Sequence, residues 1–281
     1  MIYEHEIPKR SKLYFGDSAK LKRDIENSAV EIFKEYGYEE IVTPIFSYHQ
    51  AKSISPKELI RVADEKNRLI SLRADSTLDV VRLITKRLGR SVEHNKWFYI
   101  QPVFRFPSSE IYQVGAEYIG SSDLVQPIEI SCKFFDSIAI EPLLQISNIK
   151  IPKIISWELN LPLSLFERGN LEKILDLDIK WLDKLAYLQN IEDIDEVIEI
   201  VPKSLKSELI KIKELYHKIN YNKSVVAPLY YAKMRYYDDL YFRFFIDNKT
   251  VGMGGSYTWE NYKAVGFAGY LDDIIELKEK N

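Results

Sequence analysis

The chain has 281 residues, of which 46% are hydrophobic and 29% are charged, and its formal net charge is −3. This length allows one large domain or two small ones, and the composition is that of a soluble globular protein. A dedicated nucleic-acid-binding protein usually carries a basic excess, so the charge balance argues against nucleic acid as a partner.

Membrane and disulfide signals are missing from the sequence. No apolar run approaches the roughly 20 residues that cross a bilayer, and the first ten residues, MIYEHEIPKR, contain no apolar core of a signal peptide. Cys132 is the only cysteine, which excludes an intrachain disulfide and a cysteine metal cluster. We therefore expect a cytoplasmic protein that does not contact a membrane.

The first predicted elements are a helix and a strand. The helix covers residues 18–36, where apolar side chains recur at helical spacing: Leu21, Ile25, Ala29, Ile32, Phe33 and Tyr36. Asp17 or Ser18 would cap its start, and Gly37 would end it. The strand covers residues 40–46 and is interrupted by Pro44, which has no N–H for a ladder, so we expect it at a sheet edge or an interface.

The middle and end of the chain mix strands with helices. The patterns predict, in order, a strand at 68–73, a helix at 76–88, a hairpin of 97–106 with 111–119, and a helix at 123–140. Residues 161–225 are rich in Leu, Ile, Lys and Glu at helical spacing and are interpreted as a helical insertion. Strands follow at 236–257, and a last helix starts near residue 270. This order predicts the α+β class.

Phosphate-binding and metal-binding patterns are also missing. Neither G-x-G-x-x-G nor G-x-x-x-x-G-K-[ST] occurs in the sequence. The four histidines, His5, His49, His94 and His217, do not have the spacing of metal ligands and are best explained as surface or partly buried residues. We expect no metal and no cofactor.

The second strand of the hairpin carries two polar side chains that need an explanation. Side chains alternate along a strand, so Gln113, Gly115 and Glu117 point to the same face. A small ligand with an amine at one end and a ring nitrogen at the other would fit above Gly115. The alternative is a solvated face of a one-sided antiparallel sheet.

Asp75 and Thr77, in the segment LRADST, stand where a helix is predicted to start. Asp75 or Ser76 can be its N-cap, with Asp79 completing a pattern like a capping box. A role in binding a ligand is equally compatible with this position.

Other polar and aromatic side chains fall near the predicted strands. Arg105, inside the apolar run VFRF, needs an acidic partner or an anion unless it lies at an exposed edge. Tyr236, Tyr237 and Tyr257 lie in a strongly aromatic region, where core packing is the simplest explanation.

Several segments in a fixed order carry a family resemblance. Residues 36–46, the segment LRADST, the hairpin, RYYDDLYFRFF at 235–245, and the pair GMGGSY with AVGFAGYLDDI at 264–274 resemble the motifs of a class II aminoacyl-tRNA synthetase catalytic core, in particular that of histidyl-tRNA synthetases. The resemblance covers nearly the whole chain, 1–281, and implies a single domain built on an antiparallel sheet with flanking helices. It also implies that the first motif forms a homodimer.

The resemblance implies a binding site for histidine. Asp75, Thr77 and Gln113 would surround its α-amino group, and Arg105 would face its carboxylate. The imidazole would lie between Glu117 and the aromatic side chains Tyr236, Tyr237 and Tyr257.

The segments that would bind ATP and tRNA depart from the synthetase pattern. The arginine-rich loop of the second motif shrinks to residues 107–109, and expected arginines are replaced by Ser256, by Asp273 and by Ala232, although Lys233 and Arg235 lie close to Ala232 in sequence. Arginines there neutralise triphosphate charge, whereas an aspartate repels it. We expect no catalytic residues and no anticodon-binding domain.

A chain that keeps the histidine-binding residues of a synthetase but lacks its ATP-binding arginines resembles the regulatory subunits of ATP phosphoribosyltransferase. The resemblance implies a chain without its own catalysis that assembles with a short catalytic subunit into a hetero-octamer, activates it, and allows feedback inhibition by L-histidine in histidine biosynthesis. Such control is allosteric. Two alternatives stay open: an atypical class II synthetase-like enzyme that activates an amino acid, and a structural scaffold that binds no ligand.

Overall fold

The computed structural model describes residues 6–50, 53–89, 91–232, 234 and 236–280. His5, Lys233 and Arg235 lie outside the described residues. Within these ranges, no helix combines the length and the hydrophobicity needed to cross a bilayer.

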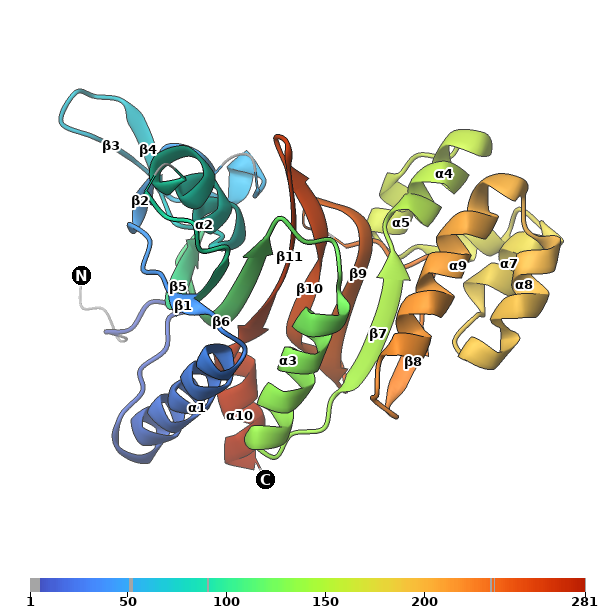
Figure 1. The fold of residues 1–281 in the computed structure, drawn as a ribbon. Helices are drawn as coiled ribbons and strands as arrows, with labels where there is room; N and C mark the ends of the chain where they lie inside the picture. The colour runs from blue at the N-terminus through green and yellow to red at the C-terminus, as the bar shows by residue number, and fades with distance from the viewer. Residues whose placement is uncertain (1–5, 51–52, 90, 233, 235, 281) are drawn as a thin grey trace.

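An eight-stranded sheet forms the centre of the fold (Figure 1). Its strand order is β1-β5-β6-β11-β10-β9-β7-β8, and the pairs β1–β5 and β7–β8 are parallel while the others are antiparallel. The strands are β1 (Glu39–Glu40), β5 (Lys96–Arg105), β6 (Ser109–Ile119), β7 (Leu143–Asn148), β8 (Ser224–Val226), β9 (Tyr237–Ile246), β10 (Lys249–Trp259) and β11 (Tyr262–Tyr270). The predicted α+β class and the β5–β6 hairpin are confirmed.

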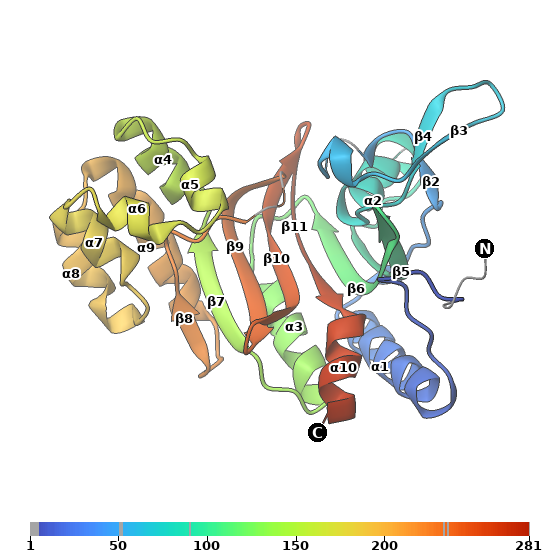
Figure 2. The ribbon, with the colours of Figure 1, turned by 180° about the vertical axis from the view of Figure 1, so that it is seen from behind.

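Three helices cover one face of this sheet (Figure 2). They are α1 (Gly16–Glu35), α3 (Val125–Ser137) and α10 (Leu271–Lys280). Phe33 of α1 lies with its ring centroid 5.1 Å from that of Phe98 in β5 and 5.9 Å from that of Phe267 in β11. The apolar spacing that predicts the first helix therefore supplies its contact with the sheet.

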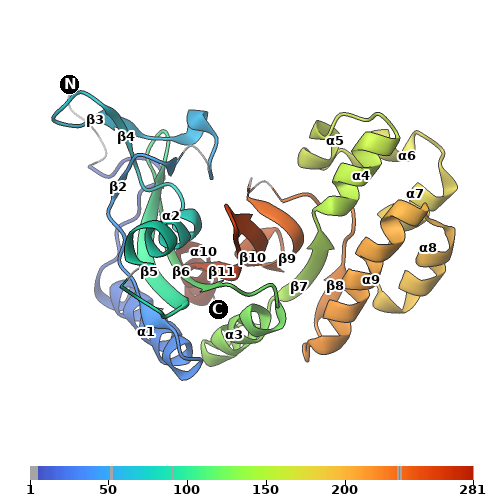
Figure 3. The ribbon, with the colours of Figure 1, turned by 45° about the horizontal axis from the view of Figure 1, so that its top comes forward.

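The opposite face of the same strands is covered by α2 (Thr77–Leu83), which continues as a π-helical turn, Ile84–Leu88 (Figure 3). Side chains of β5 alternate between the two faces: Phe98 joins the core under α1, whereas Trp97 and Tyr99 join the core under α2. The site residues discussed below lie on this α2 face.

A small second sheet stands beside α2. It has the order β2-β4-β3, with β2 (Phe46–Ser47), β3 (Arg61–Ala63) and β4 (Leu69–Leu72), and a 3₁₀ turn at Pro56–Glu58. The prediction of one strand at 40–46 is wrong, because Glu40 pairs with Phe98 in the large sheet and Phe46 pairs with Leu72 in the small one. Pro44 lies between the two strands, where the chain changes sheet and needs no ladder donor.

Helices gather beyond the β7–β8 edge of the sheet (Figures 1 and 2). They are α4 (Lys150–Glu158), α5 (Ser164–Glu167), α6 (Leu171–Leu175), α7 (Lys180–Ala186), α8 (Ile194–Ile200) and α9 (Lys203–Lys218), with a 3₁₀ turn at Ile191–Asp193. Leu205, Leu209 and Ile212 of α9 are fully buried and extend the core that lies under α1 and α3.

Candidate functional site

Strand β6 places Gln113 and Glu117 on the α2 face of the sheet. Gln113 is 4% exposed and Glu117 is fully buried. The interpretation of this face as solvated is therefore wrong. Buried polar groups need partners, so the surroundings of these two side chains decide what the face can do.

Glu117 reaches across a neighbouring strand to Tyr257. The Tyr257 hydroxyl donates a hydrogen bond to Glu117 Oε2 at 2.7 Å, although β11 lies between β6 and β10. Gly266 of β11 is the register partner of Glu117, and a Cβ built on Gly266 would lie 1.9 Å from Glu117 Oε2. Because Gly266 has no side chain, the Glu117 carboxyl group can cross over β11 at this position.

Tyr99 lies where the sequence predicted an open space. It pairs with Gly115 across the hairpin, and a Cβ on Gly115 would approach the Tyr99 hydroxyl to 2.5 Å. The prediction that the gap above Gly115 holds a ligand is therefore wrong. The Tyr99 hydroxyl instead lies 3.4 Å from Thr77 Oγ1 and 3.5 Å from Glu117 Oε1, so it links α2 to β6.

Tyr99 is missing from the residues that the sequence singled out, although the hairpin contains a signal for it. In an antiparallel hairpin whose turn is centred on residue 107, the residue numbers of paired positions add up to a constant value. The observed pair Arg105 with Ser109 puts Tyr99 opposite Gly115 by the same count.

Asp75 caps the start of α2 and is also part of the site. Its Oδ2 accepts a hydrogen bond from the Leu78 amide at 3.3 Å, as the capping prediction requires. Asp79 does not complete a capping box: its carboxylate accepts hydrogen bonds from Ser47 and from Gln50. Because Asp75 is buried next to the carboxylates of the site, a cationic ligand group would be favoured beside it.

The two buried carboxyl groups of the site have raised pKa values. Burial raises the pKa of Glu117 to about 8, although hydrogen bonds from Thr77 and Tyr257 oppose the rise. Burial likewise raises the pKa of Asp75 to about 6, and the nearby Arg105 charge lowers it in part. The charge of Asp75 also raises the pKa of Glu117, and the charge of Asp79 raises the pKa of Asp75, so the site favours a ligand that brings positive charge.

Arg105 connects the site to a large cavity. Its Nε donates to the Ala74 carbonyl at 3.2 Å, next to Asp75. The cavity has a volume of about 990 Å³, and of the eight predicted site residues only Arg105 lines it. Other walls come from residues 53–55 and 58, from 166–169 and 171, and from 227–232 and 234. The arginine is therefore placed between the buried site and an open space.

The three predicted tyrosines pack together. The Tyr236 ring centroid lies 4.7 Å from that of Tyr237 and 5.3 Å from that of Tyr257. Tyr237 is also stacked on Tyr241 at 6.0 Å. These tyrosines are packed in the core and also belong to the site, because Tyr257 donates a hydrogen bond to Glu117 and Tyr236 lowers the pKa of Asp75.

Gln113 leaves one acceptor of the site unused. Its Oε1 is buried and has no hydrogen-bond partner in the part of the chain that the structure describes. An unpaired buried carbonyl oxygen costs free energy, and a donor from a ligand would remove that cost. The structure thus brings the predicted residues to one place on the α2 face, with an acceptor at one end and a carboxyl group at the other.

None of the three positions at which the resemblance expects ATP-binding arginines and which the structure describes, Ala232, Ser256 and Asp273, carries a cationic side chain. Ser256 Oγ donates to the Leu240 carbonyl at 3.1 Å, and Ala232 is buried. Asp273 lies 3.8 Å from Lys249, and burial raises the pKa of its carboxyl group. In the described ranges, no group of three or more His, Cys, Asp or Glu side chains is arranged to hold a metal ion.

Comparison with known proteins gives consistent matches. The sequence model of the family described as Histidyl-tRNA synthetase matches residues 15–274. Two proteins named ATP phosphoribosyltransferase regulatory subunit are similar over nearly their whole length: that of Wolinella succinogenes is 46% identical, covering 98% of this chain and 96% of that protein, and that of Helicobacter hepaticus is 41% identical, covering 98% and 99%.

A solved structure shares the fold. It is described as an ATP phosphoribosyltransferase regulatory subunit/histidyl-tRNA synthetase from Bacillus halodurans, and it matches with a TM-score of 0.86 at 20% identity. The match covers 98% of this chain and 84% of that one.

Proposed function

The chain belongs to the family of ATP phosphoribosyltransferase regulatory subunits, and we propose that its α2-face site binds L-histidine as a regulatory ligand. In this proposal the chain has no catalysis of its own. It assembles with a short-form catalytic subunit of ATP phosphoribosyltransferase in the cytoplasm, activates it, and transmits inhibition by histidine, the end product of the biosynthetic route.

One observation carries the choice of ligand. Gln113 and Glu117 lie on the same buried face, where the first can bind the α-ammonium group of histidine and the second its imidazole. Gln113 Oε1 has no partner among the described residues, and Glu117 is held by Tyr257. The α-ammonium group of histidine would donate to Gln113 and approach the Asp75 carboxyl group, beside Thr77. The imidazole would exchange a hydrogen bond with Glu117, between Tyr237 and Tyr257.

Charge supports the same orientation. Arg105 stands between the site and the large cavity, so it can meet the carboxylate of a ligand that enters from the cavity. The raised pKa values of Asp75 and Glu117 mean that a positively charged group of the ligand would be favoured beside these carboxyl groups. Because Tyr99 fills the space above Gly115, the ligand would lie beside the Tyr99 ring rather than under it.

The proposed assembly contains a homodimer of this chain. Exposed apolar side chains gather where the chain passes from the large to the small sheet: Val42, Ile45, Phe46 and Tyr48. A second copy would cover this surface, as patches of this kind usually mark an interface. Such dimers would combine with catalytic subunits into a hetero-octamer.

Calorimetric titration of the purified chain with L-histidine tests the proposed ligand. We expect saturable binding, and at least about tenfold weaker binding of leucine or phenylalanine, because an apolar side chain leaves Glu117 without its partner. Glu117→Gln and Gln113→Ala should each weaken histidine binding. Glu208→Gln, which changes a buried glutamate of α9 that is bound by Asn148 and Lys211, and Gln126→Ala on α3 are the matched controls.

Activity of the complex tests the regulatory role. Co-purification with a short catalytic subunit is expected, and the two site variants should relieve histidine inhibition without abolishing activation. Equal histidine affinity in wild type, E117Q and Q113A, or no binding to wild type, would leave the chain as a scaffold without a ligand.

A further inference from the structure

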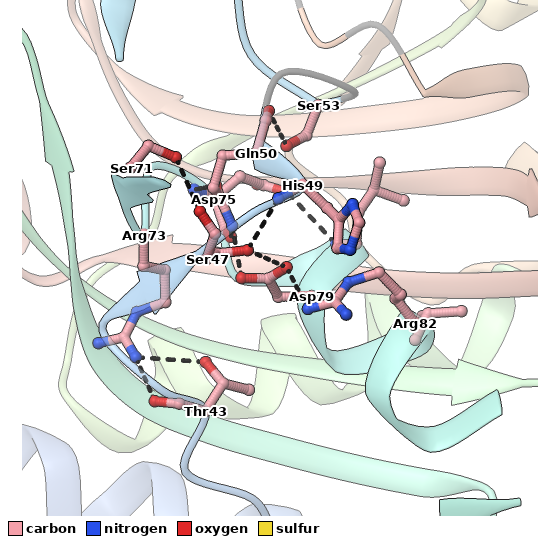
Figure 4. Close-up of polar contacts among 12 residues, drawn as sticks. Thr43, Ser47, His49, Gln50, Ser53, Ser71, Arg73, Asp75, Asp79 and Arg82 are labelled. Atoms are coloured by element: carbon pink, nitrogen blue, oxygen red, sulfur yellow. Dashed lines mark hydrogen bonds and ion pairs between the residues drawn. The ribbon is translucent and has the colours of Figure 1, made fainter. Parts of the chain in front are cut away.

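Gln50 is a buried amide that lies just after β2 and against the loop before α2 (Figure 4). Its Oε1 accepts hydrogen bonds from the backbone amides of Ala74 and Asp75, each at 2.8 Å. Its Nε2 donates to the Asp75 carbonyl at 3.2 Å and to Asp79 Oδ2. Both acceptor sites and both protons of the amide are therefore used.

The loop that Gln50 holds carries several groups of the proposed histidine site. Asp75 is part of it, and Thr77 begins the helix that follows. The Ala74 carbonyl accepts the hydrogen bond from Arg105 at 3.2 Å. A displacement of this loop would therefore move the groups expected at the ammonium end of the ligand and disturb the arginine expected at its carboxylate.

The position of Gln50 is itself fixed by a buried network. Asp79 accepts hydrogen bonds from Gln50 and from Ser47 Oγ at 3.2 Å, and it pairs with Arg82 at 3.1 Å (Figure 4). Asp79 belongs to α2. The side-chain amide of Gln50 is therefore bound to the helix through Asp79 and to the preceding loop through Ala74 and Asp75. Arg82 Nε has no partner among the described residues, but the Gln50 amide is fully paired, so the network fixes the position of Gln50.

We propose that Gln50 is a positioning residue of the histidine site, which holds Asp75 where its carboxylate meets the α-ammonium group of the ligand. This inference rests on the proposed function. Gln50 does not touch the ligand: it acts through the two backbone amides and the carbonyl of the Ala74–Asp75 segment. No apolar side chain of similar length could replace it without leaving two buried N–H groups unpaired.

The test compares two ligands that differ only in the group Asp75 would bind. L-histidine and imidazolepropionate share the imidazole and the carboxylate, but imidazolepropionate has no amino group. In Gln50→Leu we expect the ratio of the two affinities, histidine over imidazolepropionate, to fall about tenfold from its wild-type value, as the loss of one charge-assisted hydrogen bond would give. A residue that merely supports the fold would weaken both ligands alike and leave the ratio unchanged.

Two further variants sharpen the result. Gln145→Leu removes another buried glutamine, which pairs with Arg243 on β9, and should leave the ratio at its wild-type value. In an Asp75→Asn background, Gln50→Leu should cost no further selectivity, because the group that Gln50 positions has lost its charge. If Gln50→Leu does not fold by circular dichroism, Gln50→Asn, one methylene shorter, should shift the ratio in the same direction.

The outcomes separate the inference from the proposed function. If wild type binds no histidine, the proposed function fails and the inference fails with it. If wild type binds histidine but the ratio is unchanged in Q50L, or in Q50N where Q50L is unfolded, the inference alone is overturned. A lower ratio in the Gln50 variants, absent in Q145L and absent in the D75N background, supports it.

Discussion

The hydroxyl group of Tyr257 in β10 donates to Glu117 of β6 at 2.7 Å across the intervening strand β11. The contact is possible because Gly266 leaves the surface of β11 open between them. It ties three strands together on the α2 face and fixes the carboxyl group at the imidazole end of the proposed site.

Removal of this contact should lower stability by a modest amount. Tyr257→Phe keeps the ring but leaves a buried Glu117 oxygen without its donor, so we expect the free energy of unfolding to fall by about 1 kcal/mol or somewhat more. Denaturant unfolding measures it. Tyr262→Phe, which changes an exposed tyrosine of β11, is the control and should differ from wild type by less than about 0.5 kcal/mol. Equal stability of Y257F and Y262F would contradict the importance of the contact.

Stability should depend on pH through Glu117. Its pKa is raised from 4.5 to about 8 in the folded chain, so between these values the folded state holds more protons than the unfolded state. The free energy of unfolding should therefore fall as the pH rises from about 4.5 to 8, by at most about 1.4 kcal/mol per pH unit for this one group. Asp75, with its pKa raised to about 6, adds the same sign of change between pH 3.8 and 6.

Glu117→Gln should remove much of this slope. The variant cannot titrate at this position, so its stability relative to wild type should increase as the pH rises above about 5. Denaturant unfolding at a series of pH values gives both curves. Parallel curves for wild type and E117Q would show that the carboxyl group titrates near its ordinary pKa.

A methyl group on Gly266 should displace the Glu117 carboxyl group and so disrupt the site. A Cβ there would lie 1.9 Å from Glu117 Oε2 and 2.5 Å from the Ala116 carbonyl, so Gly266→Ala should cost about 1–3 kcal/mol of stability and weaken histidine binding. Gly252→Ala, in the adjacent strand β10, is the matched control because its nearest contact would be 3.3 Å. A G266A chain as stable as G252A would mean that Glu117 can leave its position at little cost.

Alternation along β6 predicted from sequence which of its polar side chains share a face, whereas the other proposed site residues followed from the family resemblance. The positions i, i+2 and i+4 on β6 put Gln113, Gly115 and Glu117 on one face without knowledge of the rest of the fold. Tyr99 and Gly266 could not be found in this way, because their roles depend on the register of β6 with β5 on one side and β11 on the other. Gln50 gives no periodic signal, since it lies in a loop and acts on backbone groups.

The helices and strands could also be predicted from the sequence only in part. The hairpin and the first helix follow from local patterns, and both are present. The change of sheet between Glu40 and Phe46 was missed, because an extended segment has the same local signature whichever sheet its ends join. Pro44 indicated that the strand is interrupted, but it did not indicate that the chain passes from one sheet to another at this point.

The chain should not catalyse amino-acid activation, the formation of an aminoacyl-adenylate from ATP. By the family resemblance, Ser256 and Asp273 stand where synthetases have arginines that neutralise ATP, and Asp273 is paired with Lys249. We expect histidine-dependent exchange of pyrophosphate into ATP to stay at background, in samples that bind histidine by calorimetry. Exchange well above background would favour the synthetase-like enzyme over the regulatory subunit.

Self-association should depend on the apolar surface near β2. Phe46 is 57% exposed and Val42 is 75% exposed in the single chain, so a second copy would remove a large apolar area from water. Phe46→Asp would bury an unpaired carboxylate in that interface, which costs several kcal/mol and should weaken the dimer at least about a hundredfold. Light scattering at micromolar concentration should therefore find a dimer for wild type and a monomer for F46D. Trp157→Asp, which changes an 82% exposed side chain of α4 on the helical side of the molecule, is the control and should remain dimeric. A monomeric wild type, or a dimer that W157D disrupts and F46D does not, would move the interface away from β2.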